Sequence, residues 1–196
     1  LETGVPSAVF PANATKSYGG AYAALDFDQM DRLYFPTKGW ASRLGYFNSP
    51  TAEYSKLYAL AFGAYSLGDY VLNAKLQYQG SAHGVLPTYD TATLGGFYNL
   101  TGFVQNQLNG DSIRYAGMRI EKIIGRLPMG LRGDMRAGLM LETGKVGNPY
   151  TETQLTGWLN SASIYLGGET PLGPVYLGYG RSDAGTSTFY LSIGTP

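Results

Sequence analysis

Charged side chains that could do chemistry occupy alternate positions in the stretch LRGDMRAGLMLETG, residues 131–144. A pair of carboxylates can act as general acid and general base, and Asp134 with Glu142 is the candidate pair here. They stand eight residues apart in the sequence, which is about 26 Å along an extended strand. The two carboxylates therefore cannot share one reaction centre, and we expect no catalytic role for them.

His83 is the single histidine, so a Ser-His-Asp triad would have to use it. No Gly-x-Ser-x-Gly elbow accompanies it, and we interpret it as an ordinary polar loop residue. Cysteine is absent, as is any metal-ligand spacing. Residues 180–185, GRSDAG, superficially resemble a phosphate loop, but their place between two strand-like segments predicts a hairpin turn. The sequence thus predicts no cofactor, no metal and no enzyme.

The charged residues lie in segments that have the two-residue period of a β-strand. Between the charged positions of residues 131–144 lie small or apolar ones, which is the alternation of a strand with two different faces. Several such segments are joined by short connections of Gly, Pro and Asp, which force antiparallel neighbours. No segment has a convincing helical period. The nine strand candidates are residues 19–28, 39–48, 53–66, 70–79, 112–124, 131–143, 157–169, 174–182 and 186–194.

The composition is poor in charge and rich in aromatic residues and glycine. Charged residues make up 14% of the 196 residues, against about 25% in soluble proteins. The formal net charge is zero, so no nucleic-acid partner is indicated. No apolar run approaches the roughly 18 residues of a membrane helix. Residues 1–16 are interpreted as an irregular leader with no signal peptide, so any signal would already have been removed.

Strand length separates two interpretations of this all-β pattern. Strands of 10–14 residues exceed the usual globular strand and match a tilted membrane strand. Tyr and Trp near strand ends are typical of aromatic girdles at lipid interfaces. A soluble β-sandwich explains the alternation equally well, but its core could not hold the charged face. That face carries Arg43, Lys75, Arg119, Glu121, Arg132, Asp134, Arg136 and Glu142.

Three motifs resemble the bacterial surface antigen superfamily, which contains outer-membrane assembly factors, their translocation-module relatives and two-partner secretion transporters. MDRLYFPTKGW, residues 30–40, resembles the family's Phe-Pro-Thr-Arg-Gly turn. Residues 94–121 resemble its long inward loop and the following strand, and residues 173–194 resemble its last two strands. The loop, LGGFYNLTGF, is most similar to that of patatin-linked autotransporter barrels. The resemblance implies an outer-membrane β-barrel over residues 17–196, with a family-type loop at 80–111.

The loop motif departs from the family pattern. Where the family has Val/Ile-Arg-Gly-Phe/Tyr, this chain has Leu100, Thr101, Gly102 and Phe103, so a threonine replaces the arginine. In the family that arginine pairs with the Asp of a Phe-x-Asp-x-Gly strand motif. Here Glu142 takes the Asp position, followed by Gly144.

The family's lock between arginine and carboxylate therefore lacks its cation. We expect Glu142 to find a substitute among Arg119, Arg132 and Arg136 across the lumen; the alternative is a solvated lumen carboxylate. The remaining predicted lumen charges are Glu121 and Asp134.

Two functions follow from the resemblance. The first is a barrel that inserts proteins or lipids into the bacterial outer membrane or translocates them across it. The second is a reduced anchoring or pore-like barrel without translocation, indicated by Thr101 and by the lack of periplasmic and patatin segments, so that the chain is either a truncated product or a natural minimal member. An outer-membrane enzyme, a third alternative, rests on His83 alone. The expected partners are outer-membrane lipid or detergent and a polypeptide or lipid substrate.

Strand number predicts association. Single-chain bacterial barrels have even numbers of strands, so we expect eight of the nine candidates in the barrel wall, with the first candidate outside it or exchanged. An eight-stranded barrel is just filled by its own side chains. The long loop would then sit outside the barrel, or two chains would share strands or lumens. Since open edges cannot be satisfied by lipid, we predict a homodimer with the first and last strands at the contact.

Overall fold

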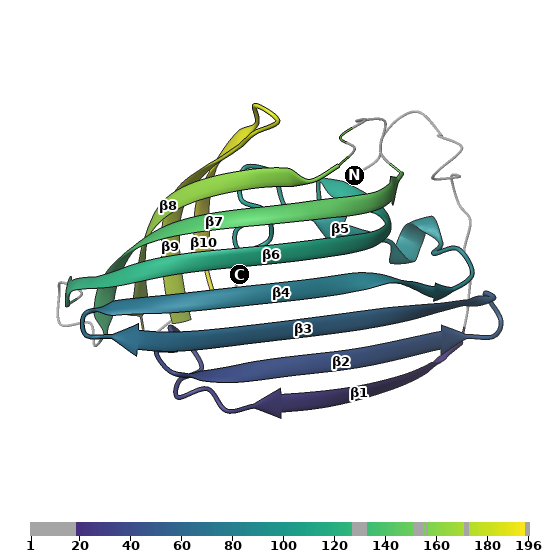
Figure 1. Cartoon of the computed structure of the whole chain (residues 1–196), viewed down its shortest axis with the longest axis horizontal. Coiled ribbons are helices and arrows are strands. Elements are labelled where there is room, and N and C mark those ends of the chain that lie inside the picture. The colour runs from purple at the N-terminus through teal and green to yellow at the C-terminus, as the bar shows by residue number, and fades with distance from the viewer. Residues whose placement is uncertain (1–18, 127–132, 151–154, 156, 171–172, 195–196) are drawn as a thin grey trace.

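Ten strands form one antiparallel sheet (Figure 1) in the order β1-β2-β3-β4-β6-β7-β8-β9-β10, with β5 paired to β6. The computed structural model describes residues 19–126, 133–150, 155, 157–170 and 173–194. The predicted leader, residues 1–16, lies outside these ranges. The strands are β1 (Ala21–Asp28), β2 (Gly39–Ser49), β3 (Tyr54–Leu67), β4 (Tyr70–His83), β5 (Ala92–Leu94), β6 (Leu108–Arg126), β7 (Asp134–Pro149), β8 (Leu159–Thr170), β9 (Gly173–Ser182) and β10 (Ser187–Ile193).

All nine predicted strands are present, and the prediction of eight strands in the wall is wrong. The first candidate, β1, pairs with β2 through eight residues, from Ala21 opposite Asn48 to Asp28 opposite Ala41. The extra strand β5 has three residues, too few to show alternation. The one helical element, among the residues described, is the single 3-10 turn η1 (Thr88–Asp90). Among the described residues, no helix is long and apolar enough to cross a membrane.

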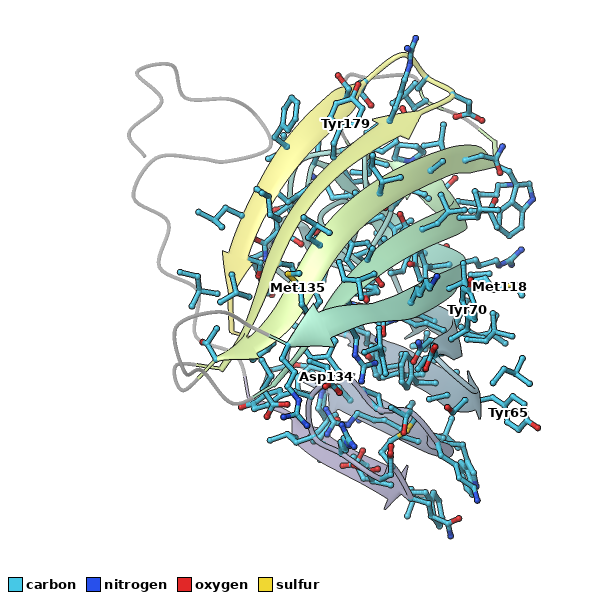
Figure 2. The ribbon with its side chains drawn as sticks, turned by 90° about the vertical axis from the view of Figure 1, so that its left-hand side faces the viewer. Tyr65, Tyr70, Met118, Asp134, Met135 and Tyr179 are labelled. Atoms are coloured by element: carbon cyan, nitrogen blue, oxygen red, sulfur yellow. The ribbon has the colours of Figure 1, made fainter. Side chains whose placement is uncertain are left out.

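The sheet curves strongly, so that it has a convex and a concave face. Figure 2 looks along the strands, with Tyr65, Tyr70 and Met118 on the outer side of the curve. Strand alternation sends apolar side chains to this convex face, where they are exposed. From β6 to β10 the exposed apolar residues are Met118, Ile120, Ile124, Leu139, Leu141, Ile164, Leu166, Leu177, Phe189, Leu191 and Ile193.

The concave face is buried and carries charged side chains. On β6 and β7 the side chains between the convex residues are those of Arg119, Glu121, Arg136 and Glu142, each at most 7% exposed. Glycines on this face leave space for aromatic rings: a Cβ on Gly138 would lie 2.2 Å from the Tyr165 ring. Charged side chains are therefore buried on the concave face while many apolar side chains are exposed on the convex face, which is not the pattern of a soluble sandwich.

The connection between β4 and β6 covers much of the concave face. It runs over residues 84–107, shorter than the predicted 80–111, because both strands extend into the predicted loop. Its apolar residues form a core with β6, β7 and β8, so the alternative that places the loop outside the sheet is wrong. This core contains Ala92, Leu94, Leu100, Phe103, Leu108, Ile113, Tyr115, Val146 and Leu159.

Two ends of the sheet can be named from its connections. The loop end is where β4 ends and β6 begins, and the turn end is the opposite one, where β1 connects to β2 through residues 29–38. At the turn end, Phe35 crosses the concave face and its ring lies 5.0 Å from that of Tyr176 on β9. The free edges of β1 and β10 pair with no other described strand.

Candidate functional site: the docked loop and its anchors

Glu142 on β7 holds the loop by its main chain. One carboxylate oxygen accepts hydrogen bonds from the Leu100 N–H (2.9 Å) and the Tyr115 hydroxyl (2.6 Å). The other oxygen accepts from the Thr101 N–H (2.7 Å) and the Ser161 hydroxyl (3.1 Å). Glu142 is 4% exposed, so these four donors replace water around a buried charge.

The two motifs singled out in the sequence therefore meet, but by a different contact. Among the described residues Glu142 forms no ion pair, so the expected cation partner is not found there. A carboxylate can be satisfied by N–H and O–H donors alone, and glutamate reaches further than the family's aspartate by one methylene. Of the three proposed cations, Arg119 and Arg136 pair elsewhere, and Arg132 lies outside the described residues.

Thr101 and Gly102 lie tightly against β9. Thr101 is fully buried, and a Cβ on Gly180 would come within 2.4 Å of its Cγ2 atom. Gly102 has φ = 118°, and a Cβ there would lie 2.8 Å from the Ser182 nitrogen. Both glycines thus permit a close approach of the loop backbone to the sheet. Phe103 completes the motif in the apolar core, fully buried.

Gly144 makes room for the same loop. A Cβ at this position would lie 3.0 Å from Leu94 and 3.5 Å from Leu100. The strand motif thus combines one residue that binds the loop, Glu142, with one that leaves space for it.

A second buried carboxylate, Glu121 on β6, organises an ion cluster nearer the turn end. Its Oε2 lies 2.9 Å from Arg136 Nη1 and its Oε1 lies 3.5 Å from Arg119 Nε. The Tyr165 hydroxyl donates to Glu121 at 2.7 Å. Glu121 is fully buried, and the two arginines are 7% and 1% exposed. The cluster carries one net positive charge on two cations and one anion.

Tyr98 connects the loop to this cluster. Its hydroxyl lies 3.0 Å from the Tyr165 hydroxyl and 3.4 Å from Glu121. The guanidinium of Arg119 lies 4.1 Å from the centre of the Tyr98 ring, a cation–π contact. Lys75 on β4 donates to the Tyr98 carbonyl at 2.9 Å. Arginine thus does contact the loop, through a tyrosine ring instead of a carboxylate.

Aromatic packing adds a third anchor. Phe97 lies between Tyr165, Tyr176 and Tyr190, with ring centres 5.3–5.8 Å apart. Tyr190 on β10 also donates to the Phe103 carbonyl. Phe35 from the β1–β2 connection lies 5.1 Å from the Arg136 guanidinium. On β3, Lys56 forms an ion pair with Asp90 of the loop at 2.5 Å. The loop is therefore bound to strands from β3 to β10.

The other predicted residues lie apart from these anchors. Asp134 is half-buried at the start of β7, opposite Arg126. It borders a polar cavity of about 340 Å³ at the turn end, together with Arg32, Arg136 and Glu169. His83 is exposed at the end of β4. Among the described residues no group of three or more His, Cys, Asp or Glu side chains could hold a metal ion.

Several anchoring residues escaped the sequence analysis: Tyr98, Tyr115, Ser161 and Tyr165. A signal existed for three of them, because Tyr115, Ser161 and Tyr165 occupy alternate positions on the inward face of their strands. Tyr98 had none, since its role depends on how an irregular loop folds back. The arrangement is suited to holding a segment in place, and it brings together no nucleophile and base.

No family model matches the sequence, and no curated protein matches it. Among solved structures, the chain is similar to the crystal structure of BamA from Haemophilus ducreyi lacking POTRA domains 1–3. The TM-score is 0.72 with 15% sequence identity, over 89% of this chain and 40% of that one.

The likeness shows that this chain has the all-β antiparallel fold found in that structure. The chain spans about two fifths of its length.

Proposed function

We propose that the chain is an outer-membrane β-barrel wall of the assembly and translocation type. The observation that carries the proposal is the meeting of the two family motifs: Glu142 accepts hydrogen bonds from Leu100 and Thr101. The fold similarity to BamA supports it. The apolar convex face then contacts lipid, and the polar concave face lines the lumen.

The orientation follows from the connections. Bacterial barrels have short periplasmic turns and longer extracellular loops. The loop end, with residues 84–107, is then extracellular and the turn end periplasmic. The substrate is an unfolded polypeptide or a lipid that enters the outer membrane beside this wall.

Reconstitution into lipid vesicles tests the function. The measurement is the rate at which an unfolded outer-membrane barrel inserts, with the wild-type chain, with Glu142→Ala, and with Asp134→Asn as the control on the same strand. We expect wild type and Asp134→Asn to accelerate insertion, and Glu142→Ala to lose most of the acceleration. Vesicles in which the wild-type chain inserts but accelerates nothing would contradict the proposal.

An anchoring barrel without translocation is the second candidate. It is favoured by the filled concave face between β4 and β10, where the loop core and the Glu121 cluster leave Arg119, Glu121, Arg136 and Glu142 almost inaccessible. A chain that neither conducts ions in a bilayer nor accelerates insertion would support this candidate. Hydrolysis of esters or peptides, lost in His83→Ala, would instead support an enzyme.

Two narrower proposals concern the type of barrel and its oligomeric state. The similarity of the loop to that of patatin-linked autotransporters stays a prediction. The homodimer is proposed because the edges of β1 and β10 are unpaired among the described strands, and unpaired edges are costly in lipid. Native mass spectrometry of the detergent-solubilised chain tests the dimer.

A further inference from the structure

Two cationic side chains lie side by side on the convex face near the loop end. Arg114 on β6 and Lys145 on β7 are direct register partners on adjacent strands (Figure 1). Both face outward, because the neighbouring Tyr115 and Val146 are buried on the concave side. Within the described ranges, neither cation has a carboxylate at ion-pair distance.

Such a pair is unfavourable unless something neutralises it. Directly opposed like charges destabilise a sheet, and the repulsion grows as the surroundings become less polar. On a mostly apolar face, two directly opposed cations without an ion-pair partner among the described residues indicate an external anion between them. Arg119 and Arg136, which also lie near each other, show the contrast: there Glu121 supplies the negative charge from within.

An apolar groove begins beside Arg114. It has a volume of about 540 Å³ and includes small side chains on two strands, Ala59 and Ala61 on β3 and Ala116 on β6. The exposed Leu76 on β4 lies between Ala61 and Ala116, as the register partner of both. Tyr78, the register partner of Arg114 on β4, lies at the same end. Trp158 is exposed beside it. The groove thus combines an apolar channel with aromatic residues and a cation at its rim.

We propose that this surface binds a phosphorylated, acylated glycolipid of the lipid A type. Its phosphate lies between Arg114 and Lys145, since a guanidinium and an ammonium both bind phosphate. One acyl chain lies in the groove over Ala116 and against Leu76. Tyr78 and Trp158 occupy the interface between headgroup and chains, as aromatic residues do in membrane barrels.

The site lies outside the lumen and goes beyond the proposed function, but it rests on the proposed membrane orientation. The loop end faces outward in that orientation, which selects the phosphorylated glycolipid of the outer leaflet over the phospholipid of the inner one. The binding needs no part of the loop anchors, so it is separable from insertion activity.

Lipid retention on the purified, folded chain in detergent tests the site. The probes are diphosphorylated lipid A, the same lipid after removal of both phosphates, and phosphatidylglycerol, and the readout is bound lipid by native mass spectrometry. We expect tight retention of the diphosphorylated lipid. Each of Arg114→Gln and Lys145→Gln should weaken it about fivefold, and the double variant roughly 25-fold. Lys122→Gln, a convex cation at the turn end beside Tyr70, is the matched control and should change nothing.

A variant that fills the groove tests the acyl-chain site independently of the cations. Ala116→Phe keeps both cations but occupies the channel, and it should weaken retention without changing the preference for phosphate. Circular dichroism confirms that each variant is folded. Equal retention by wild type and the double variant would overturn the site. Equal binding of phosphatidylglycerol, or equal binding after phosphate removal, would overturn the choice of lipid. Failure of the chain to enter vesicles at all would instead contradict the proposed function.

Discussion

Buried charges on the concave face are each matched to several donors, and this matching determines what single substitutions do. Glu142 carries four hydrogen bonds, two of them from loop N–H groups. Glu121 forms ion pairs with two arginines and accepts a hydrogen bond from a tyrosine. Removing one partner leaves the rest of a buried cluster unsatisfied, which costs more than the lost contact alone.

Glu142→Ala should lower the free energy of unfolding by about 3 kcal/mol and release the loop, because the N–H groups of Leu100 and Thr101 lose their acceptor. Urea titration measures the first effect, and limited proteolysis of residues 84–107 measures the second. Asp134→Asn should leave both unchanged. Protection of the loop in Glu142→Ala would show that the apolar core alone holds it.

Arg136→Ala should lower the free energy of unfolding by about 3–5 kcal/mol, because the more distant Arg119 would be the one cation left beside the buried Glu121 among the described residues. The double variant Glu121→Gln/Arg136→Met should cost clearly less than the sum of its single substitutions. A double-mutant cycle in urea measures the difference. Additive effects would mean that the two side chains act independently, contrary to their 2.9 Å contact.

At the scale of elements, the carboxylate of Asp31 holds together the two ends of the β1–β2 connection. Asp31 accepts hydrogen bonds from the Thr37 N–H (2.8 Å), the Thr37 hydroxyl (2.5 Å) and the Lys38 N–H (3.0 Å). Partial burial acts to raise the pKa of Asp31, but the hydrogen bonds from Thr37 and Lys38 together hold it below its ordinary value of 3.8. The same connection carries Phe35 onto Tyr176.

The connection should therefore loosen in acid. Because the folded pKa of Asp31 lies below the unfolded one, its stabilisation is present above about pH 3.8 and is lost as the pH falls through the folded pKa. Amide hydrogen exchange at Thr37 and Lys38 measures this. In Asp31→Asn the exchange should be faster at neutral pH and lack this acid-dependent step; an unchanged pH profile would contradict the assignment.

Strand β7 tests which face meets lipid. Leu139 lies well inside this strand and is 45% exposed on the convex face, so it is a suitable probe. Leu139→Arg should cost about 2–4 kcal/mol if it faces the bilayer midplane. Refolding into vesicles at graded urea concentrations measures the cost. A neutral result would favour a soluble sheet.

Strands were predictable from the sequence because alternation between apolar and charged residues is a local property. β7 is the clearest case, with Arg136 and Glu142 inward and Leu139 and Leu141 outward. The partners of those inward charges were not predictable, because they come from other strands and from an irregular loop. A cation was expected beside Glu142, whereas the described residues show it accepting hydrogen bonds from the docked main chain. Strand β5 was too short to recognise.

At the scale of the whole molecule, the loop and the β1–β2 connection bind the curved sheet from opposite ends. The loop contacts strands β3 to β10 from the loop end, and Phe35 contacts β9 from the turn end. Deleting the hydrogen bond of Tyr190 to Phe103 by Tyr190→Phe should loosen β10 selectively. Hydrogen exchange of β10, compared with that of β2, measures this; equal exchange in both would contradict it.

Strand direction restricts how the open edges can be joined. The sheet path contains nine strands in alternating directions, so β1 and β10 both run from the loop end to the turn end. Joining them, within one chain or between two copies that share a membrane orientation, would create a parallel seam in an otherwise antiparallel wall. Only an odd number of additional strands between β1 and β10 would keep every neighbouring pair antiparallel. Cross-links between Ala23 and Leu191, each replaced by cysteine, would distinguish a direct seam from an interrupted one.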